Sequence, residues 1–346
     1  MNLKFERNST ADLLKGLAVI FMIQVHITEL FANKELFYSF TGKMSLFLGG
    51  IPAAPIFMGI MGYFLAESKK STVELIKRGV YLFLGGMLLN IGININLFIH
   101  IMQGVFDLNP FNSVFAVDIF HLAGISIILL AIIKDSLSEH YLIPFSLALL
   151  FAYLSDIFST IHSSDIAIIR YITPYFGGSS EWSFFPLIPW VAYPLLGFSF
   201  NIFIKNNKLR VPITRHLLIL CTIAWGLFLL ITFDFGLNFS SNLQSYYHHS
   251  IVFTLWTIVA LSGYVFILHY LNGKAKMNPV FIYLSWVGKN VTVMYVIQWL
   301  IIGNIATSIF RTQVTYSVII WFIAITIFTS LLTFLFEKIR TKILIH

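Results

Sequence analysis

The sequence predicts an all-α, polytopic integral membrane protein with about ten transmembrane helices. Hydrophobic residues make up 58% of the 346 residues and charged residues only 11%, whereas a soluble domain carries about a quarter charged residues. The mean hydropathy is +0.84. Apolar runs near the bilayer-spanning length of about 20 residues recur along the whole chain. A chain of this composition could not cover its surface in water, so a soluble fold is excluded.

The apolar runs define the expected spans in order along the chain. They cover residues 12–32, 44–66, 75–97, 113–133, 141–160, 184–204, 213–233, 250–270, 281–304 and 317–336. One extra short or re-entrant helix is expected in 97–112 or 161–183. The first run lacks a small-residue cleavage site after it, so we interpret it as an uncleaved signal anchor. No repeat and no long linker divides the spans, so we expect a single domain over 1–346.

Positive charge alternates between the connections that join these spans. Lysine and arginine are concentrated in both terminal segments and in every second connection, while the other connections hold only Lys34, Lys43, Arg170 and Arg311. Because positive residues stay on the cytoplasmic side, both termini are expected in the cytoplasm, and the protein in a bacterial inner membrane. Topology signalling also accounts for the net charge of +7 without a nucleic-acid partner. The single cysteine, Cys221, gives no disulfide pair and no thiolate metal site.

Polar residues form a stripe on the first expected helix. Asp12, Lys15, Met22, His26 and Glu29 follow one another at spacings of three, seven, four and three residues, which places them on one helical face. Ionisable side chains in a bilayer cost about 2.5–3.5 kcal/mol each on insertion scales, so they are candidates for function. Lys15 is expected at the cytoplasmic mouth, with His26 and Glu29 deeper in the membrane.

Other expected spans bring polar residues to the same depth as His26. Asp118 and His121 lie at i, i+3 on the fourth span, Asn90 and Asn94 at i, i+4 on the third, and Gln298 on the ninth. Two His–carboxylate pairs favour general-base chemistry, because the carboxylate fixes the imidazole tautomer and stabilises its cation. The alternative interpretation is that these pairs and the asparagines only join helices through hydrogen bonds.

No metal-binding or nucleotide-binding motif is present. Two His and two carboxylates could bind Zn²⁺, but the spacings typical of zinc sites are absent, so no metal is predicted. There is no P-loop, no G-x-S-x-G and no dinucleotide-binding G-x-G-x-x-G. Gly59, Gly62, Gly85 and Gly86 lie within expected helices and are interpreted as close-packing sites.

The start of the chain resembles the opening of the membrane acyltransferase superfamily, which includes the acyltransferase type 3 and the heparan-α-glucosaminide N-acetyltransferase-like proteins. That opening runs R-x(4,5)-D-x-x-R-G-x-A, with a His eleven residues after the second basic residue. Here Arg7, Asp12, Lys15 and His26 match the pattern, with Lys15 in place of the usual Arg.

Further segments resemble later motifs of the same superfamily, in the same order. They are Pro55–Tyr63 in the second span, Lys77-Arg78-Gly79 in the third, Asp118–Gly124 in the fourth, Phe185–Gly197 with its F-P-x-x-P-W sequence, and Gly288–Tyr295 in the ninth. Gln298 stands where the family often has His. The resemblance therefore spans the chain.

The resemblance implies transfer of an acyl group, usually acetyl, from cytoplasmic acyl-CoA to a sugar hydroxyl or amine of a cell-surface glycan. It assigns His26 as general base or transient acyl carrier, with Glu29 or Asp118 orienting it. His121 belongs to the second His–carboxylate pair.

The same resemblance suggests the binding residues. Lys15 and Arg78, beside Asp12, could receive CoA phosphates at the cytoplasmic mouth. Residues expected to line the cavity and hold donor or acceptor are Asn90, Asn94, Trp190 and Gln298. The alternative function is a transporter or flippase for a glycan or lipid-linked precursor, which would use the same groups as a proton relay. The sequence makes no prediction of oligomeric state.

Overall fold

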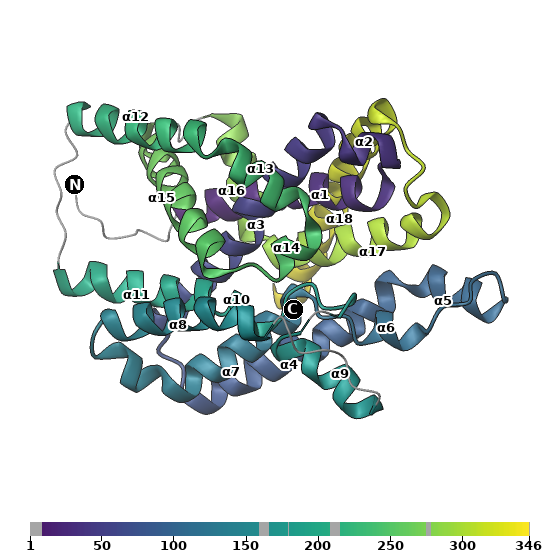
Figure 1. Cartoon of the computed structure of the whole chain (residues 1–346), viewed down its shortest axis with the longest axis horizontal. Coiled ribbons are helices and arrows are strands. Elements are labelled where there is room, and N and C mark those ends of the chain that lie inside the picture. The colour runs from purple at the N-terminus through teal and green to yellow at the C-terminus, as the bar shows by residue number, and fades with distance from the viewer. Residues whose placement is uncertain (1–8, 159–165, 179, 208–214, 275–277, 346) are drawn as a thin grey trace. The chain divides into compact units, whose positions relative to one another are not determined.

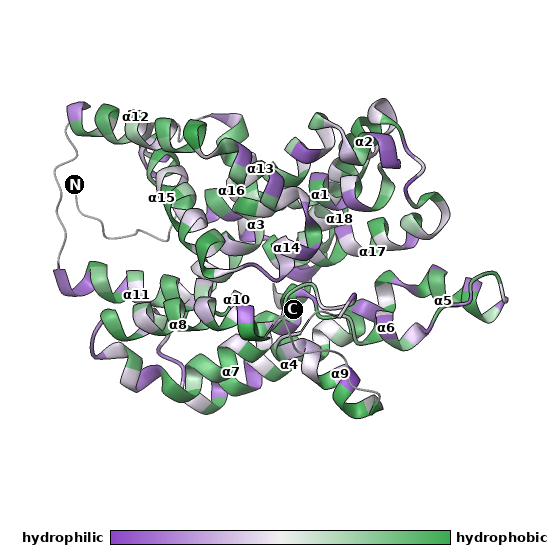
Figure 2. Ribbon diagram, viewed as in Figure 1, coloured by the Kyte–Doolittle hydropathy of each residue, from purple (hydrophilic) through white to green (hydrophobic). Residues whose placement is uncertain are grey.

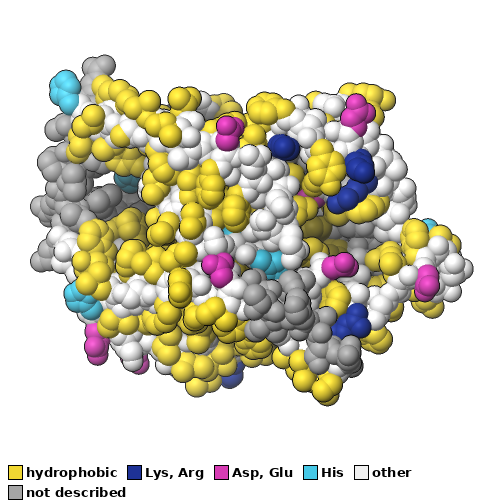
Figure 3. Space-filling model, viewed as in Figure 1, with side chains coloured by type: hydrophobic (Ala, Val, Ile, Leu, Met, Phe, Trp, Pro, Cys, Tyr) yellow, Lys and Arg dark blue, Asp and Glu magenta, His cyan; other side chains and the backbone are white. Residues whose placement is uncertain are grey.

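A computed structural model describes residues 9–158, 166–178, 180–207, 215–274 and 278–345 (Figure 1). The secondary structure of this part of the chain consists of helices joined by turns and irregular segments, with two isolated β-bridges that join Ala32 to Gln313 and Val117 to Ser183. Apolar residues dominate the ribbons (Figure 2), and hydrophobic side chains are spread widely over the face seen in Figure 3. The predicted all-α fold is confirmed.

Eight of the described helices are long and apolar enough to cross a membrane, and a bent pair would make nine. They are α1 (Ser9–Phe31), α3 (Phe40–Glu67), α4 (Thr72–Ile93), α7 (Ile119–Ser138), α10 (Leu187–Trp190) continued by α11 (Ala192–Asn207), α15 (Ile251–Lys274), α17 (Val291–Ile309) and α18 (Thr315–Ile345). The bent pair is α12 (Arg215–Ile231) and α13 (Phe233–Ser241), which meet at 58°. With the shorter apolar helix α8 (Leu142–Phe158), these elements follow the expected spans in order. The prediction of a multi-pass membrane protein is confirmed.

Short helices occupy several connections. They are α2 (Lys34–Tyr38), α5 (Ile95–Met102), α6 (Pro110–Val114), α9 (Ala167–Phe176) and α14 (Leu243–Tyr247), whereas α16 (Pro279–Lys289) lies at the start of the expected ninth span. α5, α6 and α9 lie in or beside the two connections where an extra short helix was expected. Some described side chains on α18 are exposed and apolar, as lipid contact requires, and Ile320, Ile327 and Phe328 are examples.

Two expected spans differ from the structure. The ninth is not continuous, because Asn290 leaves the helical region with φ −103° and ψ 19° and separates α16 from α17. The Asn290 side chain donates a hydrogen bond to the Trp286 carbonyl, so a polar side chain competes with the helical backbone at this point. The fourth begins later than expected, since Asp118 caps α7 and residue 119 is its first helical residue.

The chain divides into two compact units, which we name after one helix each. The α7 unit comprises Ala54–Asn90 and Asn109–Tyr264, and the α1 unit comprises Glu6–Ala53, Ile91–Leu108 and Val265–His346. In the α1 unit, α1 crosses α16 at two glycines. A Cβ added at Gly16 would overlap the carbonyl oxygen of Leu284, and one at Gly288 would overlap that of Asp12. Glycine is therefore required where these two backbones touch.

The glycines of the α7 unit mostly pack as predicted. Gly59 and Gly62 of α3 lie against the backbone of α11, and a Cβ at Gly86 of α4 would contact the ring of His121 at 2.8 Å. The prediction for Gly85 is wrong, since nothing lies within 4 Å of a Cβ placed there. Gly85 directly precedes Gly86, so it lies on a different side of α4 from the face that contacts His121.

Candidate functional site

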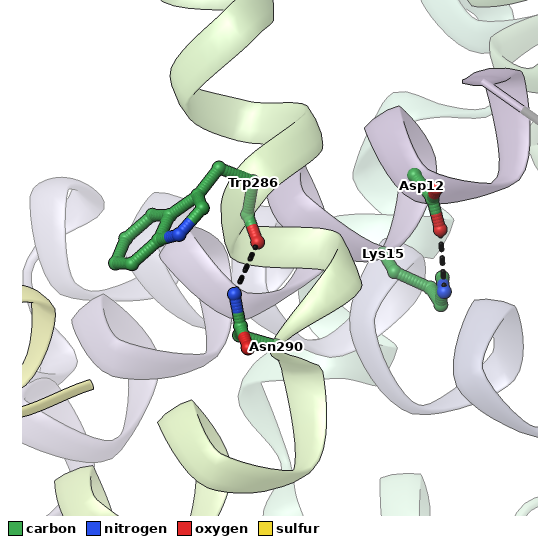
Figure 4. Close-up of polar contacts among 4 residues, drawn as sticks. All are labelled: Asp12, Lys15, Trp286 and Asn290. Atoms are coloured by element: carbon green, nitrogen blue, oxygen red, sulfur yellow. Dashed lines mark hydrogen bonds and ion pairs between the residues drawn. The ribbon is translucent and has the colours of Figure 1, made fainter. Parts of the chain in front are cut away.

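The first turns of α1 hold an ion pair. The Nζ atom of Lys15 lies 2.8 Å from Oδ1 of Asp12, and both side chains are largely but not fully buried (Figure 4). The i, i+3 spacing places the two groups over one another on the helix surface. The pair lies at the crossing with α16, because the carbonyl of Asp12 and the backbone at Gly16 are the atoms that meet that helix. The α1 face that the stripe predicted thus carries a paired cation.

The break between α16 and α17 lies in the same part of the α1 unit. Asn290 is held by its hydrogen bond to Trp286, 3.2 Å long (Figure 4). The indole Nε1 of Trp286 in turn donates to Oε2 of Glu337 on α18 at 2.7 Å. These two hydrogen bonds connect the break between α16 and α17 to α18.

His26 lies in the middle of a second group on α1 and α17. Its ring stacks on the indole of Trp299, with centroids 4.0 Å apart and planes inclined by 32°. His26 Nδ1 is buried and has no hydrogen-bond partner among the described residues, and the same holds for Trp299 Nε1. We call His26 and Trp299, together with Gln298, which precedes Trp299 on α17, the His26 cluster.

Gln298 is the most unusual member of this cluster. It is 0% exposed, and neither its amide nitrogen nor its amide oxygen has a partner in the described part of the chain. The buried face of α17 places it between Met294 and Ile302, one helical turn from each. A buried polar group that lacks a partner costs about 1–3 kcal/mol. Such a cost is typical of a site where a ligand supplies the missing partners.

Two predicted site residues lie near helix ends in the α1 unit. Glu29 is half-buried and follows His26 by about one turn on α1. Asn94 stands at the junction of α4 and α5, where its backbone carbonyl accepts from the N–H of Phe98. Asn94 is therefore a helix-start residue rather than the continuation of the Asn90 face.

Asp118 and His121 meet at the start of α7, in the α7 unit. The Asp118 carboxylate accepts from the N–H of Ile119 at 2.7 Å and from the backbone of His121, while the Asp118 N–H donates to His121 Nδ1 at 3.1 Å. This reciprocal arrangement is a capping box. The sequence predicted that the carboxylate would fix the imidazole tautomer, but the backbone amide of Asp118 does so.

The environment of His121 is closed. The residue is 0% exposed, and its Nε2 has no partner among the described residues. Phe83 and Tyr175 contact the ring edge-on, with centroids 5.1 and 5.3 Å away. Because Nδ1 accepts a hydrogen bond, Nε2 carries the proton of the neutral ring. His121 therefore presents a donor toward Gly86 rather than a base.

Asn90 supports the segment that leads into α7. Its Nδ2 donates to the carbonyls of Val114 and Ala116 at 3.0 and 2.7 Å. The next residue, Val117, donates its N–H to the Trp182 carbonyl at 2.8 Å. These bonds hold the residues before Asp118 in place. The hydrogen-bonding alternative considered for Asn90 accounts for both of its amide protons.

Trp190 lies in a closed aromatic cluster of the α7 unit. Its indole is 0% exposed and donates to the Tyr247 carbonyl at 2.8 Å. His249 packs edge-on against it at 4.8 Å and is held by Tyr246, whose carbonyl lies 2.9 Å from Nδ1, and by Tyr193, whose hydroxyl lies 3.1 Å from Nε2. Burial lowers the pKa of His249 to about 4, so the ring is neutral and accepts from Tyr193.

The remaining predictions concern charge and metal. Arg78 is exposed on α4, in the α7 unit. In the described ranges no three His, Cys, Asp or Glu side chains gather in a way that could hold a metal ion.

Sequence reasoning did not identify Trp299 or His249. Both depend on packing between helices that are distant in the sequence, which local spacing does not reveal. The position of Trp299 directly after Gln298 on a spanning helix was the only available signal.

Comparison with known proteins gives one match. The family model described as "Heparan-alpha-glucosaminide N-acetyltransferase, catalytic" matches residues 7–226, more than half of the chain. The matched region includes Lys15, His26, Asp118 and His121, whereas Gln298 lies beyond it. Neither the curated proteins nor the solved structures give a match.

Proposed function

The chain belongs to the heparan-alpha-glucosaminide N-acetyltransferase catalytic family, and from this membership we propose that it is a membrane acyltransferase. It transfers an acetyl group from cytoplasmic acetyl-CoA to a hydroxyl or amine of a sugar in a cell-surface glycan. It works in the cytoplasmic membrane of a bacterium. The membrane character of the chain supports a reaction whose two substrates come from opposite sides of a bilayer.

The His26 cluster is the observation that carries this proposal. The imidazole of His26 lies against the indole of Trp299, and the residue before Trp299 on α17 is a fully buried glutamine whose amide has no partner among the described residues. A structural core would satisfy these groups, since unpaired buried amides destabilise a fold. A thioester carbonyl and a sugar hydroxyl are an acceptor and a donor of the kind that this cluster lacks.

His26 acts in this proposal as the general base. Its Nδ1 is buried, which leaves Nε2 as the nitrogen that meets the substrate. The imidazole takes the proton of the acceptor hydroxyl or amine as the oxygen or nitrogen attacks the thioester carbonyl. The carbon–sulfur bond breaks, and the imidazolium returns the proton to the CoA thiolate. Glu29, about one turn away on the same face, stabilises the imidazolium by its charge.

The donor binds at the inner end of α1. Lys15 supplies a cation for a CoA phosphate, and its ion pair with Asp12 holds the ammonium in position while the site is empty. Arg78, which is exposed on α4, is a separate cation that binds phosphate in this proposal. Asn94 and Gln298 bind substrate in the α1 unit.

Acetyl-CoA turnover by the purified full-length protein tests the proposal. Radiolabelled acetyl-CoA should be hydrolysed or transferred by the wild type, and His26→Ala should reduce the rate at least about a hundredfold, the usual contribution of a general base. His100→Ala is the matched control, because that imidazole bonds the Asn96 carbonyl on α5 and takes no part in the proposed chemistry. Full activity in His26→Ala, with unfolding temperatures equal in all three proteins, would refute the assignment.

A further inference from the structure

The α1 unit carries a second group of cations, in connections that the charge pattern predicts outside the cytoplasm. They are Lys34, Lys43 and Arg311, three of the four lysine and arginine residues in such connections. We call these three residues the Arg311 group. Their concentration in one unit departs from the rule that keeps positive charge in the cytoplasm, which points to a role for them in binding.

The two connections that carry the Arg311 group are hydrogen-bonded to each other. The N–H of Arg311 donates to the Leu30 carbonyl at 2.9 Å, and the N–H of Gln313 donates to the Phe31 carbonyl at 2.8 Å. The N–H of Asn33, which caps α2, donates to the Gln313 carbonyl at 2.7 Å. These bonds hold the end of α1 and the start of α2 against the connection between α17 and α18.

Arg311 is fixed in an uncommon conformation. Among the described residues other than glycine it alone has a positive φ, of 53°, which side chains rarely adopt. Its guanidinium carbon lies 5.3 Å from the centroid of the Phe37 ring and 5.2 Å from that of Phe310. The side chain is exposed, and no carboxylate in the described ranges forms an ion pair with it. The guanidinium is therefore positioned by aromatic rings and keeps hydrogen-bond donors for a ligand.

The two lysines lie on elements that adjoin Arg311. Lys34 begins α2, and Lys43 follows Gly42, where a Cβ would overlap the backbone of α2. Figure 3 shows lysine and arginine side chains gathered where α2 lies in Figure 1. The neighbouring carboxylate is Glu35, which is exposed. The group consequently keeps a net positive charge.

The Arg311 group lies beside side chains that are typical of a membrane interface. Tyr38 and Phe40 are exposed after α2, and Tyr316 is exposed at the start of α18. Exposed aromatic residues are enriched at the level of lipid head groups. Further along α18, exposed apolar residues such as Ile320 and Ile327 face the lipid chains. A cationic site thus continues directly into the lipid-facing side of a spanning helix.

We propose that the Arg311 group binds an anionic phospholipid of the non-cytoplasmic leaflet. Arg311 binds the phosphate, because its planar guanidinium can form paired hydrogen bonds with two phosphate oxygens. Lys34 and Lys43 add positive charge, which favours an anionic head group over a zwitterionic one. The acyl chains lie along the exposed apolar side chains of α18. A lipid is favoured over free phosphate because the cations and the apolar surface adjoin each other. This inference goes beyond the proposed reaction and does not depend on it.

Native mass spectrometry of the purified full-length protein in detergent tests the site. The probes are dioleoylphosphatidylglycerol, dioleoylphosphatidylcholine with the same chains, and glycerol 3-phosphate without chains. The wild type should bind one phosphatidylglycerol at least about tenfold more tightly than phosphatidylcholine, since a charge-assisted hydrogen bond contributes that much. Arg311→Asn should weaken this binding about tenfold. Asparagine is the chosen replacement because it tolerates a positive φ.

Arg170→Gln is the matched control. The guanidinium carbon of Arg170 also lies near aromatic rings, 5.2 Å from the Trp182 centroid and 5.8 Å from that of Tyr171, in another connection expected outside the cytoplasm. Its replacement should leave the affinity for phosphatidylglycerol unchanged. If Arg311→Asn does not fold, Arg311→Gly removes the cation and accepts the backbone conformation without strain.

The location of the bound lipid is tested separately from its affinity. A phosphatidylglycerol with a photoreactive diazirine in its head group should label peptides from 32–43 and 310–318 of the wild type, and Arg311→Asn should reduce this labelling. Labelling confined to the connections predicted in the cytoplasm would overturn the proposal. So would equal affinity for the two lipids, full binding by Arg311→Asn, equal weakening by Arg170→Gln, or glycerol 3-phosphate binding as tightly as the lipid.

Discussion

Replacing Gln298 with methionine should stabilise the protein while it removes activity. The side chain is fully buried, and both of its amide atoms lack partners among the described residues. Each such atom costs about 1–3 kcal/mol, so the isosteric apolar side chain should raise the free energy of unfolding by about 2 kcal/mol or more. At about 2–4 °C per kcal/mol, Tm should rise by about 4 °C or more. Acetyl-CoA turnover should fall, because the substrate loses the amide that binds it.

Gln24→Met is the matched control for this experiment. Gln24 lies on α1 in the same unit, and its amide donates to the Ser45 carbonyl at 2.7 Å and accepts from the Ser45 hydroxyl at 2.6 Å. Its replacement should lower stability by about 1–2 kcal/mol, since two made hydrogen bonds are lost. Thermal unfolding of the detergent-purified proteins, followed by tryptophan fluorescence, measures both changes. A lower Tm for Gln298→Met than for the wild type would refute the reasoning, because it would show that the amide is satisfied in the folded protein.

Three further predictions follow from the packing and the caps. Gly288→Ala should destabilise the fold by about 1–3 kcal/mol, since the added methyl meets a backbone carbonyl. Gly85→Ala is the control and should raise Tm slightly, because the space around that glycine is open. Equal unfolding temperatures of the two variants would contradict the α1–α16 crossing. Asp118→Asn should change the free energy of unfolding by no more than about 0.5 kcal/mol, because Asn caps a helix as well as Asp. A fall in turnover would then assign the carboxylate a chemical role, whereas unchanged turnover would show that it only caps α7. The free energy of unfolding should fall as the pH drops from 6.5 to about 4, because His249 stays neutral in the folded protein while it is protonated in the unfolded chain. His249→Gln should remove about 3 kcal/mol of that pH dependence. A parallel decline of Tm with pH in wild type and variant would show that His249 is not responsible.

Much of the fold could be predicted because it depends on hydropathy and on local spacing. The runs of apolar residues placed the spans, and the three-residue spacing of Asp12 and Lys15 predicted a shared face that the structure realises as an ion pair. The break at Asn290 escaped prediction, since the apolar run 281–304 continues through it. The break arises because the Asn290 side chain donates a hydrogen bond to the Trp286 carbonyl in competition with the helical backbone. A hydropathy pattern does not show such a hydrogen bond.

The candidate site could be predicted only in part. His26 and Gln298 stood out because polar residues are rare in spanning helices, and the family resemblance marked His26. Their surroundings depend on contacts between distant segments, such as His26 with Trp299, which no local pattern encodes. The spacing of Asp118 and His121 predicted their proximity but not its form, because capping box and catalytic pair share the same i, i+3 separation.

The glycine crossing of α1 and α16 has a mechanical consequence. At Gly16 and Gly288 the backbones of the two helices touch directly, with no side chain between them. A side chain larger than glycine at either position would therefore force the two helices apart. The Asp12–Lys15 pair on α1 and the break at Asn290 after α16 thus belong to two helices that are joined by direct backbone contact.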